Sequence, residues 1–250
     1  MIYFMTSKFQ VGDTVLVPAA RMSNPEREAH ALVLRKVLAQ TNRSITVDNG
    51  AYGTVNVASR LVHPRNLGFL ILCVGDFRTE ATLLNPLAKS VLQFLRLLLP
   101  DDDVRSINIR TLAELGAHWS AQHAVTSHVV IIGHGSFDSV SFIDAGPVKG
   151  KDLVHRLSTA APAATPKLFV SLACQTGRAA FAKPFSQSAI CRDLIAPFNS
   201  VHGAGASQFC QSFFASHLLG GTEIPAAFSQ ARGAAVSGGA FRRWRNGSMC

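Results

Sequence analysis

The sequence has few cysteines, few acidic residues and no long hydrophobic run, and each shortage excludes a class of protein. Its five cysteines are odd in number and form no Cys-x-x-Cys pair, which argues against a disulfide framework and a zinc ribbon. The longest apolar run, around residues 67–74, is far shorter than the roughly 18 residues of a membrane helix. The opening residues, MIYFMTSKFQ, lack the features of a secretory signal. We therefore expect a cytoplasmic protein.

Glycine-rich phosphate loops are also missing. The stretch GAGAS at residues 203–207 has neither the glycine pattern nor the downstream acidic residue of a dinucleotide-binding fold. No spacing of cysteines suggests a metal site either. We expect a protein that needs no cofactor and no metal.

Negative charge is the scarcer sign. The chain has 15 Asp and Glu residues against 24 Lys and Arg residues, for a formal net charge of +9. A basic surface favours anionic partners such as nucleic acid. The only dense basic cluster is Arg242, Arg243 and Arg245. We interpret residues 237–250 as a solvated basic tail, with a binding patch as the alternative.

Residues 1–66 have the pattern of a small all-β unit. FQVGDTVLVPA at residues 9–19 alternates apolar and polar residues, and Asn49-Gly50 is a hairpin-turn signal between two further β-rich stretches. The stretch resembles Src-homology-type and KOW-like barrels, which begin with a similar Gly-Asp-x-Val. We predict a small β-barrel that binds a peptide or nucleic acid, or that only packs against a neighbouring domain.

Residues 67–236 change to alternating strands and helices. The expected strands cover residues 67–77, 104–110, 127–135 and 167–174, and helices are expected over 85–100, 111–123 and 150–160. Continuous apolar strands that alternate with helices imply a mainly parallel sheet covered on both faces. The predicted fold class is therefore α/β, preceded by the small barrel. With 48% hydrophobic residues in 250, the chain can bury a large core.

Two of the expected strands end on reactive side chains. The strand SHVVIIG runs into His134, and the strand KLFVSLA runs into Cys174. In an open parallel sheet, ligands bind outside the carboxyl ends of the strands. If the two strands are neighbours, an imidazole and a thiol meet at one edge of the sheet.

That pair of side chains suits acyl transfer. A nearby imidazolium lowers the pKa of a thiol, so Cys174 can attack a peptide carbonyl and His134 can protonate the leaving amine. Gly135 has no Cβ to shield its N–H, and it is a candidate oxyanion-hole donor together with the N–H of Cys174. A histidine or a cysteine that occurs alone is more often structural than catalytic, so the prediction depends on the presence of both at neighbouring strand ends.

The two strand ends resemble the caspase-like cysteine peptidases of clan CD, in VVIIGHGS and LFVSLACQTG. VKGKDLVHRL between them, and FCQSFFASHLLGGTEIPAAFSQAR after them, are similar to CHAT-domain proteases. The resemblance covers about residues 67–235. It implies a three-layer sandwich, a Cys174–His134 dyad and a protein substrate. CHAT-type relatives also imply a bacterial cell-death or phage-defence role in which a co-encoded effector protein is cleaved.

Two further residues are candidates for substrate binding. Asp76 stands at the end of the first expected strand, where several relatives hold a pocket residue, and there it would favour Arg or Lys before the cleaved bond; a turn aspartate is the alternative. His202 precedes Gly203 and is a second candidate for the base or the pocket. Caspases carry Gln and metacaspases Asp two places before the nucleophile, where this chain has Leu172, so specificity does not carry over.

The sequence therefore supports two hypotheses. The first is a cysteine endopeptidase that acts through a thioester. The second is a non-catalytic protein that binds nucleic acid or a partner through the barrel and the basic surface, with the caspase-like part as a scaffold. Binding to nucleic acid would weaken steeply with salt.

Overall fold

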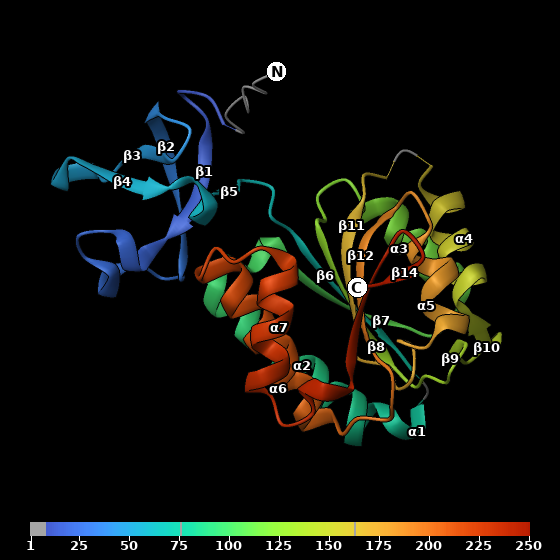
Figure 1. The fold of residues 1–250 in the computed structure, drawn as a ribbon. Coiled ribbons are helices and arrows are strands. Elements are labelled where there is room, and N and C mark those ends of the chain that lie inside the picture. The colour runs from blue at the N-terminus through green and yellow to red at the C-terminus, as the bar shows by residue number, and fades with distance from the viewer. Residues whose placement is uncertain (1–8, 76, 163) are drawn as a thin grey trace.

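The structure, a computed structural model, describes residues 9–75, 77–162 and 164–250. Figure 1 shows an all-β part at the N-terminus beside a larger part in which helices flank a central sheet. The mixed α/β class with a large, mostly parallel sheet is confirmed. Within the described residues, no helix is both long enough and apolar enough to cross a lipid bilayer.

The N-terminal part is an antiparallel sheet of five strands in the order β4-β3-β2-β1-β5. Its strands are β1 (Thr14–Pro18), β2 (Leu32–Gln40), β3 (Ser44–Asp48), β4 (Thr54–Ala58) and β5 (His63–Pro64). β2 pairs with β1 through its first half and with β3 through its second, and its register shifts between Val37 and Ala39. Among the described residues no pairing joins β4 to β5, so the closed barrel stays a prediction.

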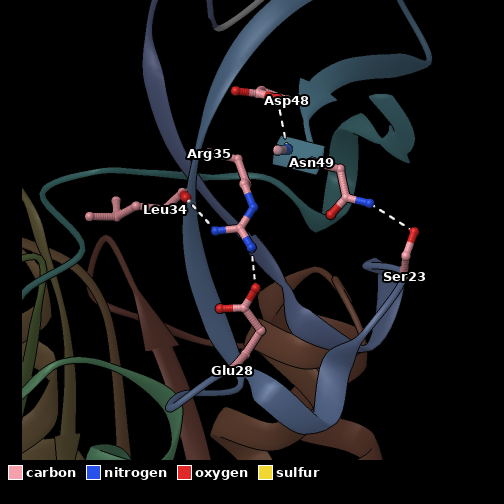
Figure 2. Close-up of polar contacts among 7 residues, drawn as sticks. Ser23, Glu28, Leu34, Arg35, Asp48 and Asn49 are labelled. Carbon is pink, nitrogen blue, oxygen red and sulfur yellow. Dashed lines mark hydrogen bonds and ion pairs between the residues drawn. The ribbon is translucent and has the colours of Figure 1, made fainter. Parts of the chain in front are cut away.

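The loops of this sheet are held by polar contacts that Figure 2 shows in close-up. Arg35 on β2 forms an ion pair with Glu28 in the β1–β2 connection, and Asn49 Nδ2 donates to Ser23 Oγ at 2.8 Å. The β3–β4 loop is longer than a tight Asn-Gly turn, which requires a positive φ at both the Asn and the Gly. Here Asn49 has a φ of −118°, and within this loop the residues with positive φ are Gly50 and Gly53. The β1–β2 connection is thus fastened to the tip of that hairpin.

The larger sheet has seven strands in the order β14-β13-β12-β11-β8-β6-β7. The five strands from β12 to β7 are parallel, and β13 and β14 add antiparallel to one edge. These strands are β6 (Phe69–Val74), β7 (Val104–Ile109), β8 (His128–Gly133), β11 (Lys167–Ser171), β12 (Cys191–Pro197), β13 (Phe241–Arg245) and β14 (Ser248–Met249). A separate hairpin is formed by β9 (Ser139–Phe142) and β10 (Gly146–Lys149).

Helices cover both faces of this sheet, as Figure 1 shows. One layer contains α2 (Asn85–Leu98), α6 (Gly203–Phe214) and α7 (Ile224–Ala234), and the other contains α3 (Leu112–Gln122), α4 (Gly150–Ala160) and α5 (Ala179–Ser186). A short helix, α1 (Phe77–Thr79), leads through a π-helical turn (Glu80–Leu84) into α2. Alternate residues of β6 point to opposite faces: Ile71 packs under α2 and α6, and Leu70 packs under α3.

Two strands of the sheet have no counterpart among the strands whose residues were predicted above. One is β12 at residues 191–197. The expected solvated tail at 237–250 was wrong, since residues 241–245 form β13 and pair with β12. The physical reason is Arg243: only 8% of it is exposed, and its guanidinium lies 2.6 Å from the buried Asp193 carboxylate.

The two parts of the chain pack against each other. The backbone N–H of Ala31 donates to the carbonyl of Leu97 at the end of α2 at 2.8 Å, and His30 Nδ1 lies 3.0 Å from the carbonyl of Arg96. Leu16 and Leu32 of the N-terminal sheet belong to the same apolar cluster as the helices α2, α6 and α7. The N-terminal sheet therefore shares a core with one helical layer.

Candidate active site

The strands that precede His134 and Cys174 are neighbours in the sheet. β8 and β11 run parallel with Ile131 opposite Ser171, and the N–H of Leu172 continues the ladder to the carbonyl of Ile131 at 2.7 Å. Both residues follow the carboxyl ends of these strands. The structure therefore brings the histidine and the cysteine to the same edge of the sheet, at the ends of two adjacent strands.

The glycines on either side of His134 are required by close backbone contacts. A Cβ on Gly133 would lie 2.5 Å from the carbonyl oxygen of Val74 on β6. A Cβ on Gly135 would lie 2.5 Å from the carbonyl oxygen of Cys174. Real Cβ atoms do not approach so closely, so only glycine lets the loop sit between the ends of β6 and β11. The packing of Gly135 against Cys174 fixes how the two loops meet.

The turn that contains Cys174 is stabilised by buried hydroxyl contacts among its neighbours. Ser171 Oγ accepts from the N–H of Ala173 at 3.3 Å and lies 2.8 Å from Thr176 Oγ1, which donates to the carbonyl of Ala173 at 2.7 Å. Each hydroxyl proton is used once if Ser171 donates to Thr176. Gln175 then takes a left-handed φ of +62°, an uncommon conformation for a residue with a side chain. This sharp turn leaves Cys174 partly exposed.

The loop after Cys174 is tied to the newly found strands. The N–H of Gly177 donates to the carbonyl of Pro197 at the end of β12 at 2.8 Å. The indole N–H of Trp244 on β13 donates to the carbonyl of Gly177 at 2.9 Å. The thiol itself lies 3.7 Å from the carbonyl oxygen of Val201. Strands β12 and β13 therefore support the segment that carries the candidate nucleophile.

Thr79 orients His134, and sequence reasoning did not single it out. Its hydroxyl lies 2.8 Å from Nε2 of the imidazole. With Nε2 engaged, Nδ1 is the ring nitrogen left to exchange a proton with a thiol or a substrate. Thr79 ends the short helix α1, and nothing in the local sequence marks one threonine there over its neighbours.

The other two predicted site residues have different outcomes. His202 is exposed and caps α6, where its Nδ1 accepts from the N–H of Ala204 at 3.3 Å. It directly follows Val201, whose carbonyl faces the thiol, so it lies beside the site. Asp76 lies outside the described residues.

A shallow apolar cavity of about 280 Å³ opens beside these residues. The segment that continues from Thr79 forms one wall, and the segment that continues from Val201 forms the other. The lining residues are Thr82, Leu83, Pro86, Leu87, Ser90, His202, Gly203, Ala204 and Ser207. No charged side chain is among them, so the cavity suits an apolar group.

The remaining cysteines are poor candidates for a nucleophile. Burial, together with the carboxylate of Glu80, raises the pKa of the Cys73 thiol to about 11. Burial also raises the pKa of Cys191 and of Cys210. Cys250 is exposed but lies after the last strand. Among these residues, only Cys174 combines exposure with a place at the carboxyl edge of the parallel strands.

Comparison with known proteins gives a likeness of fold. No model of a known protein family matches the chain, and no curated protein sequence matches it. A structural match is found to a secreted C11 cysteine protease from Bacteroides thetaiotaomicron, solved in complex with an irreversible peptide inhibitor. The match has a TM-score of 0.50 and 9% sequence identity, and it covers 72% of this chain and 66% of that protease, less than two thirds of its length. With the sheet order and layers above, this likeness shows that the chain has a caspase-like peptidase fold.

Proposed function

We propose that the protein is a cysteine endopeptidase that uses Cys174 as nucleophile and His134 as general acid and base. The observation that carries the proposal is the meeting of the two residues at the carboxyl ends of adjacent parallel strands, with Gly135 packed against the carbonyl of Cys174. The likeness of fold to a cysteine protease supports it.

The proposed reaction begins with transfer of the thiol proton of Cys174 to Nδ1 of His134. The thiolate attacks the carbonyl carbon of the scissile peptide bond, and the carbonyl oxygen becomes an oxyanion. His134 then gives its proton to the departing amine, and a thioester remains on Cys174. Water attacks that thioester with His134 as base, which releases the acid product and restores the thiol.

The N–H groups of Gly135 and Cys174 are the proposed donors to the oxyanion. No hydrogen bond from either of them to another described residue is present, so both are available to a substrate. Loss of one such donor typically costs about 3 kcal/mol in the transition state. Thr79 holds the imidazole through Nε2 so that its other nitrogen is presented to the reacting atoms.

We further propose that the apolar cavity beside His202 takes an apolar side chain of the substrate. Its walls continue from the two segments that contact His134 and Cys174, so a chain bound across the dyad passes over it. Recognition of Arg or Lys by Asp76 is the competing proposal. The residues on either side of the cleaved bond distinguish the two.

The test is digestion of a diverse peptide pool, with the products identified by mass spectrometry. The wild-type protein and a Cys250→Ala control, which loses an exposed thiol outside the site, are expected to cut the same bonds. Cys174→Ala is expected to cut none while keeping its circular dichroism spectrum. Equal cleavage by Cys174→Ala would overturn the proposal.

The resemblance to CHAT-type proteases extends the proposal to a bacterial cell-death or phage-defence role with a co-encoded effector protein as substrate. Coexpression with neighbouring gene products tests this. A substrate protein is expected to be cut in the presence of the wild-type chain and to stay intact with Cys174→Ala. If every neighbouring gene product stays intact with the wild-type chain, this role is wrong.

A further inference from the structure

A second cavity, of about 420 Å³, lies at the other end of the large sheet. His128 begins β8 and lines this cavity, whereas His134 follows the end of the same strand. The two histidines are six positions apart along the strand, which corresponds to a distance of roughly 20 Å between their backbones. The remaining lining comes from β5 and its preceding turn, from the start of β12, from β13 and from the loop before α7. The cavity therefore lies between the N-terminal sheet and the α/β part, away from the proposed active site.

His128 is a deeply buried polar residue in the lining of the cavity. Its side chain is buried, with only 4% of the residue exposed, and its ring stacks on Phe69 with centroids 4.6 Å apart. Nδ1 lies 2.7 Å from Ser127 Oγ, whose proton goes to the carbonyl of Gly68 at 3.1 Å. Nδ1 must then donate to the serine, which leaves the Nε2 lone pair as an acceptor. Within the described residues, this buried Nε2 has no hydrogen-bond partner.

The charged lining of the cavity is mainly positive. Four arginines and two carboxylates line it, so two positive charges are in excess. Asp193 lies 2.6 Å from the guanidinium of Arg243, and its other oxygen lies 3.9 Å from Nε of Arg192. The arginines are Arg60, Arg192, Arg243 and Arg245, and the carboxylates are Asp193 and Glu223. Arginine presents a planar fork of donors that suits phosphate and carboxylate groups.

Two further histidines brace the walls. His63 Nε2 of β5 lies 2.8 Å from the carbonyl of Leu218, and His217 Nδ1 lies 2.7 Å from the carbonyl of Thr222. The three histidines do not form a metal site: in the described part of the chain, no three His, Cys, Asp or Glu side chains are placed to hold a metal ion. These contacts hold the walls in place. The charged side chains that line the cavity are mainly cationic, and Nε2 of His128 is a buried acceptor.

We propose that this cavity binds a small molecule that carries phosphate or carboxylate groups. Its anionic groups lie against Arg192 and Arg245. The volume is within the range of small-molecule sites. Because the lining comes from both parts of the chain, a bound ligand holds the N-terminal sheet against the α/β part and raises the melting temperature.

The test is isothermal titration calorimetry of the wild-type protein at constant ionic strength, with glycerol 3-phosphate and citrate as probes. The two probes separate phosphate from carboxylate as the recognised group. Saturable binding of one probe at a 1:1 ratio is expected. Arg245→Ala should weaken that binding about tenfold, as for the loss of one charge-assisted contact.

A matched variant makes the result specific to this cavity. Arg27→Ala removes the same charge from an exposed turn outside the cavity, and it should change binding less than twofold. Absence of binding for both probes would overturn the proposal, as would an equal loss in Arg27→Ala and Arg245→Ala. Peptidase activity plays no part in this measurement.

Discussion

The contact between Gly135 and the Cys174 backbone provides a sharp test of the active-site geometry. A methyl group added at Gly135 would lie 2.5 Å from the carbonyl oxygen of Cys174 and 3.0 Å from the Cβ of Ala173. Ordinary contact begins near 3.4 Å, so Gly135→Ala must push the two loops apart by about 0.9 Å on the shorter contact. Neither neighbour is the flexible end of a side chain, so the backbone has to move.

The expected consequences follow from that displacement. A misplacement near 1 Å lowers the rate of a positioned reaction by about 100-fold, so kcat/KM for the best peptide should fall by about that factor. Overpacking of this kind destabilises by about 1–3 kcal/mol. For a chain of this size that corresponds to a decrease of roughly 3–9 °C in melting temperature.

The control is Gly233→Ala, at a helical glycine where an added Cβ meets nothing within 4 Å. It should leave kcat/KM unchanged. The assays are steady-state hydrolysis of a peptide found in the pool digestion and thermal unfolding followed by circular dichroism. If Gly135→Ala is folded and hydrolyses that peptide at the wild-type rate, the reasoning that this glycine sets the approach of the two loops is refuted.

Three further predictions concern other contacts. Thr79→Val should lower kcat about fivefold, which corresponds to one lost hydrogen bond of about 1 kcal/mol, and should shift the pH profile, whereas Thr79→Ser should keep the wild-type profile; equal profiles for both variants would contradict the orienting role. Asp193→Asn should cost about 3–5 kcal/mol in urea denaturation, because it leaves the buried Arg243 unpaired, while Asp101→Asn, in an exposed pair, should cost less than about 1 kcal/mol. Burial lowers the pKa of His128 well below 6.5, and the positive charges of His217, Arg192, His63 and Lys167 lower it further. Below pH 6.5 the unfolded chain therefore takes up a proton that the folded chain excludes. The free energy of unfolding of the wild-type protein should fall by up to about 1.4 kcal/mol per pH unit below pH 6.5, relative to His128→Phe.

The strand ends could be predicted from the sequence because parallel strands share a direction. Once the strands before His134 and Cys174 were identified as continuous apolar runs, their carboxyl ends had to lie on the same edge of the sheet. Whether the strands were neighbours could not be deduced, because strand order depends on how the crossover helices pack. The structure has β8 and β11 side by side.

The strand at 241–245 could not be predicted, because its arginines are typical of a solvent-exposed segment when that segment is considered alone. Asp193 and Arg243 are buried as a pair, and that pairing is visible only when both segments are placed together. A sequence pattern is interpreted one segment at a time. The two halves of a buried ion pair between distant segments are therefore each predicted to be solvent-exposed.

Thr79 shows a different limit. Hydroxyl residues are common near strand ends, and only the path of the chain through α1 brings this one to the imidazole. The cavity at the N-terminal ends of the parallel strands is similar, since its arginines come from three separate elements. Such sites are assembled by the fold from residues that no local motif connects.

The anchoring of the Cys174 loop by β13 has a consequence for synthesis of the protein on the ribosome. The indole of Trp244 holds the carbonyl of Gly177, yet 67 positions separate the two residues along the chain. Domains fold as units while translation proceeds, so a nascent chain that ends before β13 lacks this support. The proposed nucleophile, and with it the proposed peptidase activity, would be in place only after residue 245 has emerged.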